Sequence, residues 1–116
     1  MKIEMLSDGS FKDTFSEITR IFNKNGLLHC DNGPAVFSSI TNFKCWYING
    51  QRHRTDGPAI EYANGDKFWY LNGQLHRIDG PAVEYEDHME YWYKGINLSE
   101  KEYFSPEFQV RILMER

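Results

Sequence analysis

The chain has 116 residues, a formal net charge of −4 and 41% hydrophobic residues. This length suits one domain with a modest core, and the acidic balance argues against a protein that binds nucleic acid through a basic face. No apolar run approaches the roughly 18–20 residues of a membrane span, and the N-terminal residues lack a signal-peptide core, so we expect a cytoplasmic protein with no membrane partner.

The first predicted element, residues 8–25, is a degenerate half-repeat of a unit that recurs further along the chain. Gly9 precedes Phe22 by 13 residues, as Gly33 precedes Trp46, so Phe22 takes the place of the tryptophan. Terminal repeats commonly depart from a pattern in this way. Nothing in this half-repeat protects a sheet edge, which makes a two-fold homodimer through that edge plausible.

The next predicted elements are three copies of one motif. They read NGLLHCDNGPAVFS at 25–38, NGQRHRTDGPAIEY at 49–62 and NGQLHRIDGPAVEY at 72–85, with KCWYI, KFWYL and EYWYK following them. The tryptophans are 23 and 23 residues apart. A period this short means one supersecondary unit per repeat, which buries its apolar face by stacking on its neighbours.

Within the last complete copy the pattern predicts a succession of hairpins. Asn72-Gly73 is a strong hairpin signal, because both central residues of a type I′ turn need positive φ. Asp79-Gly80 marks a second turn, and the proline after it opens a strand, where a missing N–H costs least. The predicted strands are Lys67–Leu71, Gln74–His76, Pro81–Tyr85 and Met89–Tyr93.

The C-terminal residues 99–116 are predicted to form a short helical cap over the last sheet edge. Ser99 and Glu102 have the spacing of a capping box. Ser105 is then a helix N-cap, with Pro106 at the first helical position. We expect the helices to block strand addition at that edge.

Together these elements predict a mainly β protein. Its sheet is a single antiparallel meander of stacked hairpin repeats, each about 23 residues long, closed by the helical cap. We expect one domain over residues 1–116, made of the half-repeat 8–25, repeats 26–49, 50–72 and 73–95, and the cap 99–116. The aromatic content of 16% also favours strands over helices.

A histidine column, His29, His53 and His76, is the first candidate site. Equivalent residues in successive repeats lie at least two strands apart, about 10 Å, whereas zinc ligands lie about 2 Å from one ion. The column therefore cannot form one metal site, and we expect no metal and no cofactor. The structural interpretation is that each histidine hydrogen-bonds a turn and packs against an aromatic ring.

A polar cluster, His-Arg-x-Asp-Gly, is the second candidate. Its members are Arg54 and Arg77, Asp56 and Asp79, and Gly57 and Gly80, with Cys30 and Asn32 in the first copy. The structural interpretation is an Asp that caps its turn and an Arg that bonds carbonyls or stacks on a Trp. The functional interpretation is a ladder of His53, Arg54, His76 and Arg77 that binds an anionic ligand or an acidic protein surface.

Aromatic columns are the third candidate. The tryptophans are Trp46, Trp69 and Trp92, and the tyrosines are Tyr47, Tyr70 and Tyr93, with Tyr62 and Tyr85 in the returning strands. Neighbouring residues on a strand point to opposite faces. We expect the tryptophans in the core and the column of Tyr47, Tyr70 and Tyr93 on an exposed binding face, because tyrosine offers a large contact area with a polar end. Tyr62 and Tyr85 could join either face.

Enzyme signatures are absent from the sequence: it has no Gly-rich phosphate loop, no nucleophile elbow and no HExxH motif. A non-enzymatic protein is the expectation, with a hydrolase as the alternative. The two cysteines, Cys30 and Cys45, do not recur in the other copies. We expect them to be free thiols, buried or half-buried.

The segment NGQRHRTDGPAIEYANGDKFWYLNGQLHRIDGPAVEY resembles short repeat proteins of tailed bacteriophages and related bacterial genomes. The resemblance covers about residues 23–104, and the ending LSEKEYF is similar to the acidic helical tail of such proteins. The unit is more distantly similar to MORN-type repeats, which serve as protein- or lipid-binding scaffolds. Related bacterial repeats occur in toxin–antitoxin settings. The resemblance implies a location in the bacterial host cell.

Three functions follow as hypotheses. The leading one is a non-enzymatic, phage-type binding protein that occupies a host protein, for which a counter-defence role fits. The second is a small-molecule binder that sequesters a phosphate-bearing, nucleotide-derived signal on its His-Arg pairs beside aromatic rings. The third is an antitoxin or immunity-like protein, which would behave like the first in most binding assays.

Overall fold

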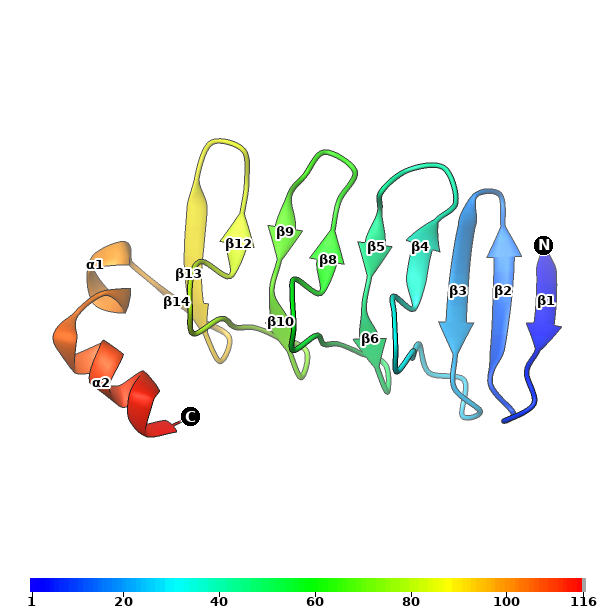
Figure 1. The fold of residues 1–116 in the computed structure, drawn as a ribbon, viewed down its shortest axis with the longest axis horizontal. Coiled ribbons are helices and arrows are strands. Elements are labelled where there is room, and N and C mark those ends of the chain that lie inside the picture. Colours follow the sequence, from blue (N-terminus) through cyan, green and yellow to red (C-terminus); the bar gives the residue numbers. More distant parts are fainter. Residues whose placement is uncertain (116) are drawn as a thin grey trace.

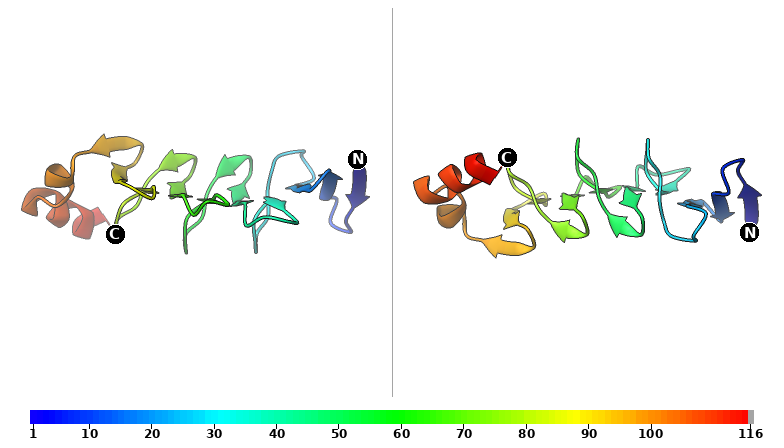
Figure 2. Two further views of the ribbon diagram at one scale, coloured as in Figure 1. Left: turned by 90° about the horizontal axis from the view of Figure 1, so that it is seen from above. Right: turned by 90° about the horizontal axis from the view of Figure 1, so that it is seen from below.

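One antiparallel sheet of ten strands dominates the computed structural model, which describes residues 1–115 (Figure 1). The strand order is β1-β2-β3-β4-β5-β8-β9-β12-β13-β14, and two short hairpins form small sheets of their own. The molecule measures 51 × 30 × 17 Å, and no second sheet lies over the first within the described residues (Figure 2). The predicted β meander with a helical cap is confirmed.

The N-terminal strands are β1 (Lys2–Met5), β2 (Phe11–Phe15) and β3 (Ile18–Phe22). The predicted half-repeat covers residues 8–25 and leaves β1 out. Its four residues lie outside the repeat and carry no turn signal of their own, so only the pairing with β2 identifies them as a strand.

Each full repeat contributes one long hairpin to the main sheet. These strands are β4 (Val36–Ser38) and β5 (Lys44–Cys45), β8 (Ile60–Glu61) and β9 (Lys67–Phe68), and β12 (Val83–Glu84) and β13 (Met89–Tyr93). The predicted strand Pro81–Tyr85 is therefore shorter than expected. The predicted strand Lys67–Leu71 is interrupted at Trp69, after which the chain enters a second, smaller hairpin.

The smaller hairpins lie at the opposite end of each repeat. They are β6 (Tyr47–Ile48) with β7 (Gln51–Arg52), β10 (Tyr70–Leu71) with β11 (Gln74–Leu75), and the end of β13 with β14 (Ile96–Leu98). Asn72 and Gly73 have φ of 51° and 80°, which confirms the predicted turn. Lys94 keeps the same conformation, with φ of 48°, although it lacks the side chain that makes Asn tolerant of it.

The pairing of the strands shows which side chains share each face of the main sheet. Residues opposite each other in an antiparallel pair share a face. Lys44, Glu61, Lys67 and Glu84 pair in turn and alternate in charge, which defines the charged face. Cys45, Ile60, Phe68 and Val83 pair in turn on the other side, which we call the apolar face.

A column of alanines forms the centre of the sheet. Ala35, Ala59 and Ala82 follow the repeat prolines and have no exposed surface. The backbone of each alanine is hydrogen-bonded to the chain on both sides. The N–H of Ala59, for example, donates to the carbonyl oxygen of Phe68, and the carbonyl oxygen of Ala59 accepts from the N–H of Trp46. The three positions share this bonding pattern, which explains why the same small residue recurs in every repeat.

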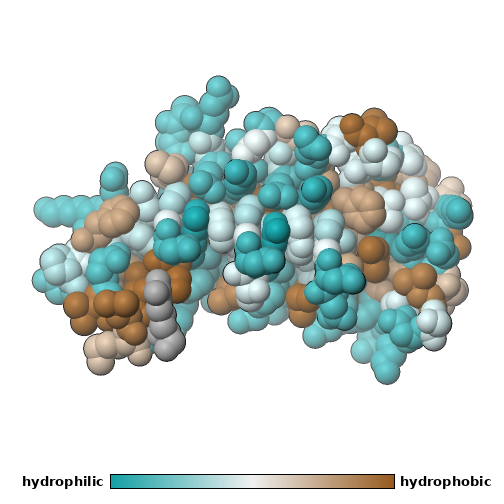
Figure 3. Space-filling view, viewed as in Figure 1, coloured by the Kyte–Doolittle hydropathy of each residue, from teal (hydrophilic) through white to brown (hydrophobic). Residues whose placement is uncertain are grey.

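Two helices, α1 (Glu100–Tyr103) and α2 (Pro106–Glu115), follow β14 and lie beyond the last hairpin (Figure 1). The predicted capping box is present: Ser99 Oγ accepts from Glu102 N–H, and Glu102 Oε1 accepts from Ser99 N–H. Tyr91, Tyr93, Tyr103 and Ile112 form the buried cluster between cap and sheet. In Figure 3 hydrophilic side chains cover the middle of the sheet, and hydrophobic ones gather at the two ends of the molecule.

Candidate functional site

Each histidine of the column joins its own motif copy to the hairpin turn that follows it. The Nδ1 atom of His53 accepts a hydrogen bond of 2.9 Å from the backbone N–H of Asn72, in the following hairpin turn. His29 binds Asn49, and His76 binds Lys94, with the same length. Nδ1 is an acceptor only when it carries no proton, so each of these bonds requires that nitrogen to be unprotonated. The expectation that each histidine bonds a turn is confirmed.

Each arginine of the repeat is enclosed on two sides. Cζ of Arg54 lies 3.8 Å from the centroid of the Trp46 ring, and Cζ of Arg77 lies 3.7 Å from that of Trp69. On the other side stands the glycine of the same repeat. A Cβ at Gly57 would lie only 2.7 Å from Cζ of Arg54. The glycine is therefore needed for room, since its backbone does not have positive φ.

The guanidinium groups are also saturated with acceptors from their own chain. Nε of Arg54 donates to Asp56 over 2.9 Å, and Nη1 donates to the carbonyl oxygen of Pro58 over 3.1 Å. Glu61 lies 3.9 Å from the same Nη1. Arg77 repeats this arrangement with Asp79, Pro81 and Glu84. Two carboxylates thus balance each arginine, as the structural interpretation of the cluster requires.

The first copy replaces this arrangement with smaller contacts. Cys30 stands where the arginine would be, and its thiol donates to Asn32 over 3.4 Å. His29 uses its second ring nitrogen, Nε2, to reach Asp31 over 2.9 Å. Both cysteines are free, with Cys45 buried and Cys30 half-buried, as predicted. Burial raises the pKa of the Cys45 thiol.

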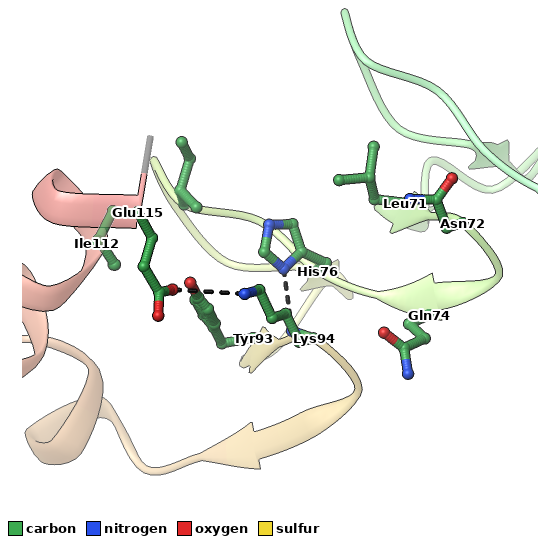
Figure 4. Close-up of a pocket in the computed structure, with 9 residues that line it drawn as sticks. Leu71, Asn72, Gln74, His76, Tyr93, Lys94, Ile112 and Glu115 are labelled. Atoms are coloured by element: carbon green, nitrogen blue, oxygen red, sulfur yellow. Dashed lines mark hydrogen bonds and ion pairs between the residues drawn. The ribbon is translucent and has the colours of Figure 1, made fainter.

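A series of cavities runs between successive repeats. Their volumes are about 580, 630 and 300 Å³, and neighbouring cavities share lining residues such as Cys30 and Arg54. A further cavity of about 320 Å³ lies between the last repeat and α2, where His76, Tyr93 and Glu115 line it (Figure 4). An ion pair of 3.5 Å joins Lys94 to Glu115 there. The His-Arg ladder therefore lines grooves, although its cations are paired internally.

The tyrosine column does not form an exposed face, which corrects the sequence-based expectation. Tyr93 is only 6% exposed, because α2 covers it and Phe108 packs edge-on against its ring. Tyr47 and Tyr70 are half-buried. Burial raises the pKa of the Tyr47 hydroxyl, which also interacts with Cys45 and Arg52.

The tryptophans are not core residues either. Trp46, Trp69 and Trp92 are all half-buried. Their rings lie on the arginines of the next repeat or bond a carboxylate: Nε1 of Trp69 donates to Glu84 over 3.1 Å. The alanine column occupies the sheet centre in their place, so the expectation of buried tryptophans is wrong.

A continuous row of aromatic rings lies along the apolar face, near the ends of the long hairpins. We call Phe43, Tyr62, Phe68 and Tyr85 the aromatic row. Their centroids are 5.7, 5.5 and 5.7 Å apart in that order, and His88 extends the row beyond Tyr85. Tyr62 is 42% exposed and the other three are half-buried.

The aromatic row brings together Tyr62 and Tyr85, two candidate binding residues that the sequence did not assign to a face. Its two phenylalanines were not among the predicted site residues: Phe43 lies outside the three motif copies, and Phe68 was predicted only as part of a strand. Acidic residues stand beside the row. Desolvation, followed by the nearby carboxylates of Glu90 and Asp66, raises the pKa of Tyr85.

Residues 1–115 contain no group of three His, Cys, Asp or Glu side chains placed to hold a metal ion. Within the same residues, no helix has both the length and the apolar character needed to cross a bilayer. The chain matches no protein-family model, no curated protein and no solved structure.

Proposed function

We propose that this chain is a non-enzymatic binding protein whose aromatic row contacts another protein. The observation that carries the proposal is the continuity of the row along four neighbouring strands, β5, β8, β9 and β12, with Tyr62 42% exposed. Tyr62 and Tyr85 offer large, rigid contact surfaces with polar ends, a combination enriched at protein interfaces.

The charges around the row indicate the chemistry of the partner. Asp66 and Glu90 lie close enough to Tyr85 to affect its ionisation, and Asp87 pairs with His88 at the end of the row. Negative charge beside aromatic faces attracts Arg and Lys side chains, both by Coulomb attraction and by cation–π contact. We therefore infer a partner surface that combines basic and apolar residues.

The biological setting rests on the repeat motif alone. Its resemblance to phage repeat proteins supports a host protein as the partner and a bacterial cytoplasm as the location. A counter-defence role fits this setting, as does an antitoxin or immunity role.

A double variant, Tyr62→Ala with Tyr85→Ala, tests the surface. The tagged wild-type chain is used to capture a partner from bacterial lysate, and calorimetry with the purified partner then measures affinity. We expect the double variant to bind at least about tenfold more weakly, as is typical of aromatic contact residues. Affinity equal to that of the wild type would exclude the aromatic row as the contact surface.

Two control variants separate binding from folding. Lys44→Ala with Lys67→Ala removes two side chains from the charged face and should leave affinity unchanged. Tyr62→Phe with Tyr85→Phe keeps both rings and should retain most of the binding. Urea denaturation of each variant shows whether the chain remains folded under the binding conditions.

The alternative function, sequestration of a phosphate-bearing small molecule, would use the groove lined by Arg54, Arg77 and Trp69. A phosphate there would have to displace the carboxylates that already pair with both arginines. This competition disfavours the alternative. A rise in melting temperature with cyclic nucleotides, lost in Arg77→Gln, would instead support it.

A further inference from the structure

The outer edge of β1 is open. The strand ends the sheet order, pairs only with β2 among residues 1–115, and has four exposed residues. At the opposite end of the sheet, α1 and α2 follow β14 (Figure 1). An open edge presents unpaired N–H and C=O groups to any strand of matching register.

The hydrogen bonds of Leu6 show which groups face outward. Its N–H donates to Ser10 over 2.8 Å, and its carbonyl oxygen accepts from Gly9 over 3.1 Å, so both groups point toward β2. In an antiparallel pair this direction alternates with each residue. Lys2 and Glu4 therefore also bond β2, while Ile3 and its odd-numbered neighbours direct N–H and C=O to the open edge.

We propose that two copies of this chain pair through β1 about a two-fold axis, with Ile3 opposite Ile3 of the second copy. The outward groups of both strands then meet, as a ladder requires. Lys2 of each copy lies opposite Glu4 of the other, which places two pairs of opposite charge on the charged face. Met1 lies opposite Met5 on the apolar face.

No neighbouring register satisfies the same conditions. A shift of two residues places either Lys2 opposite Lys2 or Glu4 opposite Glu4, and like charges directly opposite are destabilising. A shift of one residue brings backbone groups that point to the open edge opposite groups that already bond β2. It also places the apolar face of one copy beside the charged face of the other. The four residues of β1 are thus self-complementary in one arrangement.

The surrounding side chains support this arrangement. Glu4 lies 3.8 Å from Lys12 on β2, so in the dimer it would lie between Lys12 and Lys2 of the second copy. This row lies on the same face as the alternating charges of the repeats, although uncharged residues of β3 and β4, Thr19 and Phe37, stand between the two groups. On the apolar face, Ile3 and Met5 are 61% and 67% exposed, and pairing would cover them.

Sedimentation velocity over a range of concentrations tests the proposal. We expect the wild-type chain to show a monomer–dimer equilibrium and Ile3→Pro to remain monomeric. Proline removes an N–H that points to solvent, so the monomer loses no internal hydrogen bond. Circular dichroism and the urea midpoint check that Ile3→Pro is folded. A wild-type chain that is monomeric at its highest soluble concentration would overturn the proposal.

Charge reversal tests the register. Lys2→Glu and Glu4→Lys each place like charges opposite one another in a self-dimer, and each should raise the dissociation constant about tenfold. In an equimolar mixture of the two variants every cross-strand pair is again of opposite sign, so the mixture should associate as tightly as the wild type. A mixture no tighter than the separate variants would exclude this register.

Discussion

The Nδ1 atom of His53 accepts the backbone N–H of Asn72 over 2.9 Å, and this single bond connects the second motif copy to the first residue of the third. Asn72 is the turn residue with φ of 51°, so the histidine fixes the one segment of the hairpin whose backbone is least favourable. The same bond occurs at both ends of the array, to Asn49 and to Lys94.

Removal of this acceptor should weaken the array. His53→Ala leaves the Asn72 N–H without its partner, and we expect a loss of about 1–2 kcal/mol in the free energy of unfolding. Urea denaturation measures the loss. His88→Ala is the matched control, because the side chain of His88 is exposed and contacts Asp87, Glu90 and Tyr85 of its own hairpin, with no bond to a following hairpin turn. Equal losses in the two variants would contradict the role assigned to the column.

Stability should also depend on pH through His76. Partial burial, followed by nearby Lys94, lowers the pKa of His76 below its usual value of 6.5, while Glu115 opposes the shift. The unfolded chain therefore takes up the proton at higher pH than the folded one. The stabilisation is complete above about pH 6.5 and is lost as the pH falls toward the lower folded pKa.

Denaturation midpoints at several pH values between 8 and 5 measure this dependence. Carboxylates contribute to the same curve, so the difference between wild type and His76→Gln is the informative quantity. We expect the wild type to lose more stability than the variant over this range. Parallel curves would show that His76 titrates alike in the folded and unfolded states.

Because Arg54 is enclosed between Trp46 and Gly57, a side chain added at Gly57 should destabilise the fold by steric overlap. Gly57→Ala would bring a Cβ within 2.7 Å of Cζ of Arg54, and we expect a loss of about 1–3 kcal/mol from the resulting displacement. Gly33→Ala is the control in the first copy, where the nearest atom is Sγ of Cys30 at 4.0 Å. Thermal unfolding should separate the two variants. In Arg54→Ala the cost of Gly57→Ala should largely disappear.

The cap depends on one buried hydroxyl. Tyr103 is 1% exposed, and its hydroxyl donates to the carbonyl oxygen of Arg77 over 2.8 Å and accepts from Gly80 N–H over 3.3 Å. Tyr103→Phe leaves both backbone groups unpaired and should cost about 1–3 kcal/mol. Hydrogen exchange at Gly80 should accelerate. Tyr62→Phe, at an exposed position, is the control and should change neither quantity.

The hairpins were predictable because their signals are local. Asn-Gly pairs require positive φ wherever they occur, and a proline can open a strand only where its N–H is not needed. The capping box at Ser99 is local in the same sense. Turns and helix caps of this kind are decided by a few adjacent residues, so the sequence alone was enough to locate them.

The aromatic row could not be predicted, because equivalent residues have different partners in successive repeats. Tyr62 N–H bonds Asp66, but Tyr85 N–H bonds His88, so the third hairpin closes one residue earlier. Gly65, with φ of 96°, permits the longer loop, whereas the third copy has no glycine there. Ile60 consequently pairs with Phe68, whereas Val83 pairs with Glu90.

This one-residue change sends Tyr91, the counterpart of Phe68, to the cap instead of the row. It packs there on Tyr103, with ring centroids 4.7 Å apart. The burial of Tyr93 has a similar origin, since the cap that covers it belongs to no repeat. Equivalent positions of a repeat have the same surroundings only where a further repeat follows, and the last repeat is followed by the cap.

The histidine bond extends from each motif copy to the hairpin turn that follows it and no further. Within residues 1–115 this bond sets the number of repeats no limit, because it involves only adjacent units. An in-frame insertion or deletion of one 23-residue unit such as 50–72 would create junctions of the same kind as those already present. The length of the sheet, and with it the reach of the aromatic row, can therefore change in whole steps without a redesign of the two ends.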